Sequence, residues 1–316
     1  MAAAIALGQR GRGQTSPNPN VGCIIVGDGR VTGRGWTQPG GRPHAEAMAL
    51  ETAGRQAQGA TAYVTLEPCA HLSPRGPACA ATLIEAGIGR VVYAIDDPDP
   101  RTAGKGAAML CAAGIAVDGG CLAAAARASM AGFFSRQERG RPHLTLKLAT
   151  SLDGRIAMAD GRSRWITGAV ARRHAHLERA RHDVIIVGRG TVEADDPRLD
   201  VRVEGLESRS PRRAVLTRGA APEGWIAISS PDAVSALDHA DHVLVEGGAG
   251  AAAAFLVAGI VDRLILYRAP VLIGAGKAAL GDIGLARIDE AHGQWRLSDA
   301  RMLGSDRLEV YERQGS

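Results

Sequence analysis

Short apolar runs alternate with longer helical stretches along most of this 316-residue chain. In the first half the runs 21–26, 61–66 and 90–95 are bounded by Gly, Pro, Asn or Asp, which is typical of strands. A first helix precedes them, Asp28-Gly29 is predicted to form a tight hairpin turn, and an Ala-rich helix at 122–130 closes the set. This alternation predicts a three-layer α/β domain.

A second set of the same kind begins near residue 140. The run 143–149 alternates apolar and polar residues like a strand. The runs 183–188 and 242–248 are almost continuously apolar, which is typical of strands buried in a parallel sheet. We therefore expect two α/β domains, 1–140 and 141–316.

One stretch of the first half carries a compound motif, in which His44-Ala-Glu46 is followed by a predicted strand, Cys69 and then Cys79. Zinc prefers thiolate and imidazole ligands, and a catalytic zinc typically has three protein ligands and an open position. His44, Cys69 and Cys79 supply three. Glu46 would lie about 200° around a helix from His44, so it is a poor co-ligand and a better proton carrier. Zinc deaminases have the same arrangement, with three zinc ligands and a glutamate that carries protons without binding the metal.

The elements around this motif can also be predicted. The helix that follows Pro43 should carry His44 and end at Gly54. Cys69 follows its strand where a helix could begin, and a helix N-terminus lowers a thiol pKa. Nine residues separate the two cysteines, whereas the commonest deaminase pattern has two. A structural zinc site with His71 as fourth ligand, or two buried free cysteines, therefore remain as alternatives.

Composition limits the kinds of ligand and the compartment that can be expected for this chain. The formal net charge is only +4 and aromatic residues make up 3% of the chain, which argues against a nucleic-acid groove and for a small-molecule substrate. The five cysteines all lie in the first half, in an odd number, so a reducing cytoplasm is the simpler expectation. The start of the chain lacks the features of a signal peptide, and the longest apolar run, 251–261, is too short to span a membrane.

Glycines follow two of the predicted strands in the second half, at Gly188-Arg-Gly190 and at Gly247-Gly248. Glycines let the backbone approach a ligand, and the N-terminus of a following helix favours a phosphate, so a nucleotide cofactor is one interpretation. Neither cluster completes the dinucleotide fingerprint; after Gly188 and Gly190, for example, Glu193 occupies the place of the third glycine. The segment 271–278 does not match the P-loop motif either. Plain tight turns are the other interpretation.

Longer motifs in both halves carry a specific resemblance. In the first half they are PNPNVG at 17–22, HAE at 44–46, YVTLEPC at 63–69 and GPAC at 76–79; in the second they are LKLATSLDG at 146–154, SRWIT at 163–167, TVEADDP at 191–197 and VEGG at 245–248. Together they resemble the bifunctional riboflavin-biosynthesis deaminase/reductase family. The resemblance implies a cytidine-deaminase-like first domain and a dihydrofolate-reductase-like second domain. It also implies zinc-dependent hydrolytic deamination of 2,5-diamino-6-ribosylamino-4(3H)-pyrimidinone 5′-phosphate, followed by NADPH-dependent reduction of the ribose to ribityl.

The resemblance further implies residue roles. One Zn²⁺ would be held by His44, Cys69 and Cys79, with Glu46 as proton donor. Substrate in the reductase would contact Ser163, Arg179, Leu199, Arg202 and Glu246. NADPH would contact Ala149, Trp165, Thr167, Thr191, Asp195, Gly248, Ala249, Gly250, Ala251, Ala252, Ala253 and Ala254. The sequence leaves open the roles of Arg75 and of Asp99, which stands where the family often has asparagine, and whether Arg218 binds the 2′-phosphate of NADPH.

Two other functions compete with this one. The chain could be a nucleoside or nucleic-acid zinc deaminase fused to an unrelated domain, for which a basic, aromatic-bearing groove would be expected. It could instead be a zinc-stabilised ligand-binding protein without turnover, whose first domain would unfold when zinc is removed. A homo-oligomer is possible in any of these cases, and we expect neither nucleic acid nor membrane as partner.

Overall fold

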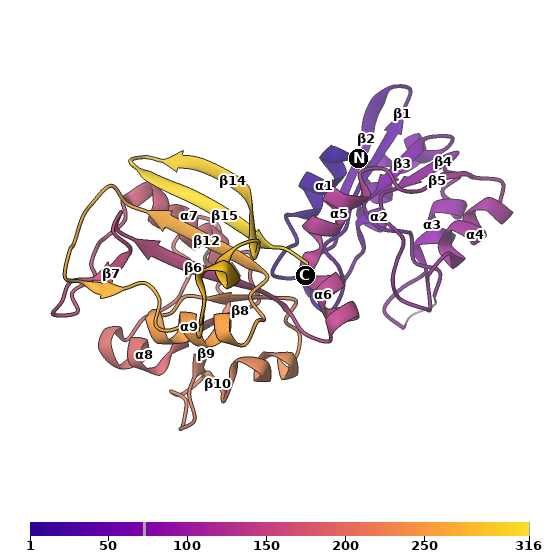
Figure 1. Cartoon of the computed structure of the whole chain (residues 1–316). Helices are drawn as coiled ribbons and strands as arrows, with labels where there is room; N and C mark the ends of the chain where they lie inside the picture. The colour runs from indigo at the N-terminus through magenta and orange to yellow at the C-terminus, as the bar shows by residue number, and fades with distance from the viewer. Residues whose placement is uncertain (72–73, 316) are drawn as a thin grey trace. The chain divides into compact units, whose positions relative to one another are not determined.

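The structure is a computed structural model and describes residues 1–71 and 74–315. The chain divides into two compact units, Met1–Gly140 and Arg141–Ser316, and each unit is built around its own mixed sheet flanked by helices (Figure 1). The predicted α/β class is confirmed in both.

The first unit contains a five-stranded sheet in the order β2-β1-β3-β4-β5. Its strands are β1 Gly22–Gly27, β2 Arg30–Trp36, β3 Thr61–Val64, β4 Arg90–Tyr93 and β5 Ala116–Asp118; its α-helices are α1 Ala2–Gly8, α2 Ala45–Ala53, α3 Cys79–Glu85, α4 Lys105–Ala112, α5 Ala123–Ser129 and α6 Ala131–Arg139; short 3₁₀ turns lie at Pro39–Gly41 and Gly54–Ala57. The strands β3, β4 and β5 are parallel, and β1 is antiparallel to both of its neighbours.

Two local features shape the β1-β2 hairpin and the packing of α2 against it. The predicted hairpin turn is confirmed, because Asp28 and Gly29 have φ of 50° and 72°, as a type I′ turn requires. Farther along β2, Gly33 and Gly35 let α2 approach closely, since a Cβ on Gly35 would lie 2.1 Å from the Ala45 carbonyl oxygen. The start of α2 is therefore held directly against the sheet.

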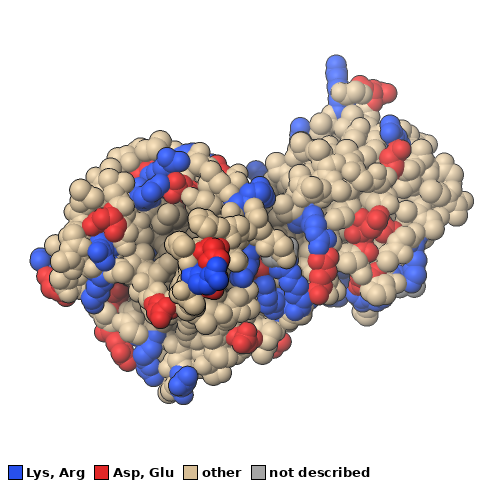
Figure 2. Space-filling model, viewed as in Figure 1, with Lys and Arg blue, Asp and Glu red and all other residues tan. Residues whose placement is uncertain are grey.

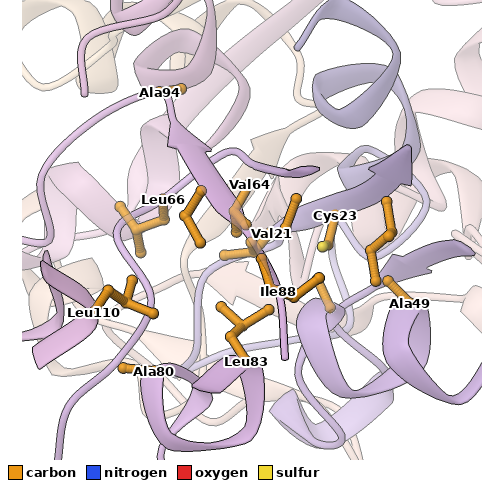
Figure 3. Close-up of a cluster of buried hydrophobic side chains, with 14 of the residues drawn as sticks. Val21, Cys23, Ala49, Val64, Leu66, Ala80, Leu83, Ile88, Ala94 and Leu110 are labelled. Carbon is orange, nitrogen blue, oxygen red and sulfur yellow. The ribbon is translucent and has the colours of Figure 1, made fainter. Parts of the chain in front are cut away.

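The core of the first unit is a continuous apolar cluster between sheet and helices (Figure 3). Val21 and Val64 contribute from the sheet side, and Leu83 and Leu110 contribute from α3 and α4. The expected last helix, 122–130, corresponds to α5, but the sequence pattern gave no signal for α6. Apart from its buried pair Phe133 and Phe134, much of α6 is polar, which hides it from an apolar-run analysis.

The second unit contains an eight-stranded sheet in the order β10-β9-β8-β11-β6-β12-β15-β14, and a two-stranded ribbon, β13-β7. The strands are β6 His143–Thr150, β7 Arg155–Ala157, β8 Val184–Gly188, β9 Arg212–Leu216, β10 Ile226–Ile228, β11 His242–Val245, β12 Arg263–Arg268, β13 Lys277–Ala278, β14 Trp295–Leu303 and β15 Asp306–Arg313; the α-helices are α7 Ala169–Arg179, α8 Arg189–Asp195 and α9 Ala249–Val257; 3₁₀ turns lie at Glu207–Arg209, Pro231–Ala236 and Ile288–Ala291.

Six strands of this sheet, from β10 to β12 in spatial order, run parallel. The prediction of buried parallel strands is confirmed for β8 and β11, whose central residues are all buried. The carboxyl ends of parallel strands lie at one edge of the sheet, where α/β proteins bind ligands, and α8 and α9 begin at that edge. Among the described residues, no helix has the length and apolar character needed to cross a bilayer.

Candidate functional sites

Three potential metal ligands converge in the first unit. One ligand atom each from His44, Cys69 and Cys79 lies within 4.8 Å of the others. His44 Nδ1 is 3.2 Å from the Cys79 sulfur and 3.7 Å from the Cys69 sulfur. The other ring nitrogen, Nε2, lies 3.0 Å from the Asn18 side-chain amide, which turns Nδ1 toward the cysteines. Two sulfurs and an imidazole fit the ligand preference of zinc and leave one tetrahedral position open.

Two details of the predicted geometry are wrong. His44 is the extended residue that precedes α2, with φ −73° and ψ 162°, so it lies outside the helix and the expected 200° rotation to Glu46 does not apply. Cys69 lies in an irregular segment, and the helix begins at Cys79 instead. The Cys69 sulfur nevertheless accepts the backbone N–H of Cys79 at 3.3 Å, so it faces the start of that helix from outside.

The pKa values of neighbouring groups in this cluster are shifted in different directions. The hydrogen bond from the Cys79 thiol lowers the pKa of Cys69 to about 4, with further help from His44 and against the effect of burial. The same bond and burial raise the pKa of Cys79. Burial also raises the pKa of Glu46, which lies in the first turn of α2 and is only 4% exposed. Glu46 is therefore suited to hold a proton beside the ligands.

A cavity of about 430 Å³ opens onto this cluster. His44, Glu46 and Cys69 line it; the other lining residues are Pro17, Asn18, Pro19, Val21, Thr37, Arg42, Leu66, Glu67, His71, Pro74, Arg75, Asp97, Asp99, Arg101, Phe133 and Gln137. Three of these are arginines, a residue type whose planar fork fits a phosphate. The cavity is therefore both metal-adjacent and suited to a phosphorylated ligand.

Two residues whose roles the sequence leaves open, Asp99 and Arg75, line this cavity. Asp99 is ion-paired with Arg101, whose Nε lies 2.9 and 3.0 Å from the two carboxylate oxygens, so its charge is countered. Arg75 donates to the Asn18 side-chain oxygen and lines the same cavity.

His71 Nδ1 lies 3.2 Å from the Thr102 hydroxyl, outside the group of metal ligands, so the structure does not make it a fourth ligand.

Glu67 is among the residues of this site that the sequence analysis did not predict. Glu67 is buried between β3 and Cys69, and its carboxylate accepts the backbone N–H groups of Gly104 at 3.0 Å and Ala107 at 3.1 Å. It thereby ties the cysteine loop to the start of α4. A carboxylate at the end of an apolar strand was the available signal.

A second cavity, of about 680 Å³, lies at the carboxyl ends of β6, β8, β9 and β11. Nine of the predicted reductase residues line it: Ala149, Ser163, Thr191, Asp195, Glu246, Gly248, Ala249, Gly250 and Ala251. Gly248 is the N-cap of α9, and its N–H lies 3.3 Å from the Thr191 hydroxyl oxygen. The helix N-terminus at this wall suits an anionic group.

A buried ion network lies at the β11 end of this cavity. Glu246 receives Lys147 Nζ at 3.2 Å and two nitrogens of Arg179 at 2.8 Å each. Burial opposes the ionisation of Glu246, but the charges of Lys147 and Arg179 outweigh it and hold its pKa well below the usual range. Lys147 was missed by the sequence analysis, although a lysine in the middle of an apolar strand is itself a signal.

Each half of the chain matches a known protein family. Residues 142–308 match the model of the RibD C-terminal domain, and residues 1–95 match that of the cytidine and deoxycytidylate deaminase zinc-binding region. The riboflavin biosynthesis protein RibD of Escherichia coli is 41% identical, and the match covers 97% of this chain and 96% of that protein. The chain belongs to the RibD family.

Solved structures of RibD-family proteins agree with this assignment. A RibD structure from Acinetobacter baumannii is 37% identical with a TM-score of 0.86, and a deaminase/reductase from Thermotoga maritima is 30% identical with a TM-score of 0.87. Each match covers 99% of this chain and 97% of the other. As a family member, the chain is a bifunctional riboflavin-biosynthesis enzyme with a zinc-binding deaminase domain and a reductase domain. The predicted family, fold and enzyme class are confirmed, and an unrelated second domain or a protein without turnover is contradicted.

The other residues predicted to contact substrate or NADPH in the reductase do not line the second cavity. Leu199 lines a separate cavity of about 300 Å³, and Arg202 lies beside Asp200. Trp165 is 63% exposed and stacks against Arg172, whose guanidinium carbon is 4.7 Å from its ring centre. The others off the cavity lining are Thr167, Arg179, Ala252, Ala253 and Ala254; of these, Ala252 and Ala253 are buried.

Proposed function

We propose that residues 1–140 deaminate 2,5-diamino-6-ribosylamino-4(3H)-pyrimidinone 5′-phosphate with zinc, and that residues 141–316 then reduce the ribose of the product with NADPH. The first assignment is carried by the convergence of His44, Cys69 and Cys79 next to a cavity that His44, Cys69 and the buried Glu46 line. The name of the Thermotoga maritima relative, a diaminohydroxyphosphoribosylaminopyrimidine deaminase and 5-amino-6-(5-phosphoribosylamino)uracil reductase, supports the choice of substrates.

In the deaminase, His44, Cys69 and Cys79 would hold zinc, which supplies an activated water and a Lewis acid when bound. Burial raises the pKa of Glu46, which favours its protonated form, and we assign to it the transfer of protons to the ring nitrogen and to the departing ammonia. Arg42, Arg75 and Arg101 line the same cavity and fit the 5′-phosphate of the substrate.

In the reductase, the nine lining residues named above surround space for a dinucleotide, and the N-terminus of α9 suits its pyrophosphate. NADPH supplies the hydride when bound. We assign to Lys147 and Glu246 the orientation of the sugar carbon that receives it, since both line the cavity and are fixed by their ion pair. Ser163 lines the same cavity, and Arg179 supports Glu246.

The deaminase assignment is tested with Glu46→Gln, which keeps the size of the side chain and removes its acid function. We expect the variant to bind one zinc per chain and to release ammonia about 10²- to 10⁴-fold more slowly. Glu51→Gln is the matched control, because Glu51 lies on the same helix and is exposed. A zinc-loaded Glu46→Gln protein with wild-type ammonia release would refute the role.

A further inference from the structure

We propose that Arg189, supported by the Thr217 hydroxyl, recognises the 2′-phosphate that distinguishes NADPH from NADH. The inference deepens the proposed reductase function and rests on it. Arg189 is the first residue of α8, directly after β8, and it lines the second cavity. Leu216, the last residue of β9, lines the same cavity, and Thr217 directly follows it in the chain.

The order of strands places this pair at the far end of the cavity from the proposed chemistry. Lys147 is on β6, and the sheet then passes through β11 and β8 to β9. Neighbouring strands are about 4.8 Å apart, so this end lies about 14 Å from β6. Gly248, at the start of α9, lies between the two ends. A dinucleotide with its reacting ring at Lys147 and its pyrophosphate at Gly248 therefore extends its adenosine toward β9.

The guanidinium of Arg189 is held in one orientation. Its Nε donates to the Thr217 hydroxyl oxygen at 3.1 Å, and its Nη2 donates to the Ala220 carbonyl oxygen at 2.9 Å. A guanidinium has five N–H donors, so further donors are available to an anion. Fixing the group beforehand lowers the entropic cost of binding that anion.

The Thr217 hydroxyl completes a pair of donors. Its oxygen accepts from Arg189 Nε and also from the backbone N–H of Gly219, at 3.1 Å each. A hydroxyl has two acceptor sites and one hydrogen, so with both acceptor sites used the hydrogen is left to donate. A phosphate oxygen, which accepts only, suits this arrangement better than a ribose hydroxyl does.

The surrounding charges agree with an exchangeable anion site. Glu193 Oε1 is 3.8 Å from Arg189 Nε, and both side chains are substantially exposed, so this pair is weak and a phosphate can compete for the cation. Arg218, the candidate from the sequence, is exposed and does not line the cavity. It lies next to Thr217 in the chain and therefore makes a matched control.

The test is titration calorimetry on the full zinc-loaded chain with NADPH, NADH, 2′,5′-ADP and 5′-AMP. In Arg189→Ala we expect the affinity for NADPH and 2′,5′-ADP to fall about 10- to 100-fold, the range for a lost charged hydrogen bond. The affinity for NADH and 5′-AMP should stay within about twofold, which also shows that the site is folded. Arg218→Ala should match wild type with all four.

The outcomes separate the inference from the function on which it rests. Equal losses for NADPH and NADH in Arg189→Ala would make Arg189 merely structural and overturn the inference. Unchanged NADPH affinity would do the same while leaving the reductase intact. If the wild-type chain binds neither dinucleotide, the proposed cofactor itself is wrong. An Arg189→Lys variant that recovers part of the NADPH preference would support the inference, since it restores the charge without the fork.

Discussion

At the residue scale, the two sites each contain a buried carboxylate, and their proton affinities are shifted in opposite directions. Burial raises the pKa of Glu46, whereas Lys147 and Arg179 overcome burial and lower that of Glu246. The difference matches the proposed roles: Glu46 carries a proton, and Glu246 is a fixed charge that holds Lys147 in place.

The Glu246 network predicts a pH dependence of stability in the second unit. Because the pKa of Glu246 is lower in the folded state, its stabilisation is present above its unfolded pKa of about 4.3 and is lost as the pH falls through the folded value. Glu246→Gln should lack this acid-side loss. At pH 7 it should be less stable by about 3–5 kcal/mol, because two cations lose their partner.

Hydrogen exchange of β6 and β11 in the full chain, between pH 6 and pH 3, measures this effect. Glu223→Gln is the control, since Glu223 is exposed. A Glu246→Gln protein whose protection falls with pH as steeply as that of wild type would contradict the account.

The sequence predicted the metal ligands because His44, Cys69 and Cys79 form a local motif with distinctive spacing. It missed Glu67, Lys147 and Arg189. Their roles depend on partners distant in the chain: Lys147 meets Glu246 across 99 positions, and Arg189 meets Thr217 across 28. Only the folded sheet brings these residues together.

At the element scale, the deaminase site depends on how closely α2 packs on β2. Gly35→Ala would bring a Cβ to 2.1 Å from the Ala45 carbonyl oxygen, so α2 must shift, and His44 directly precedes it. We expect a loss of about 1–3 kcal/mol in stability, as for other overpacked sites, together with weaker zinc binding.

Zinc competition against a chelator and thermal unfolding measure the two effects. Gly29→Ala is the control. It has open space around it and a φ of 72°, so it should cost about 1–2 kcal/mol from backbone strain and leave zinc affinity unchanged. Wild-type zinc affinity in Gly35→Ala would show that α2 does not position the ligand.

Elements with a strong apolar signal were predictable, and those without one were not. The strands β8 and β11 are buried on both faces, so their sequences are continuously apolar. The hairpin β14-β15 went unnoticed, since most of β14 is exposed and its residues do not alternate. The helix α6 was hidden by its polar residues, yet its Phe133 lines the deaminase cavity.

At the scale of the whole molecule, the two units each contain a complete cavity with its own charged groups. On the face shown in Figure 2, basic and acidic side chains are interspersed over both units. A nucleic-acid surface would instead favour a continuous basic stripe. The cavities, with their arginines and helix N-terminus, suit small phosphorylated ligands. The mixed charges on this face do not favour a polyanion.

In the proposed function, one chain performs deamination and then reduction. The most direct test is NADPH oxidation by the purified zinc-loaded chain, supplied with the diamino-pyrimidinone phosphate and no other enzyme. We expect steady oxidation that disappears in Glu46→Gln and returns when the deaminated compound is added to that variant. Oxidation that persists in Glu46→Gln with the diamino substrate, or no oxidation by wild type with either compound, would contradict the account.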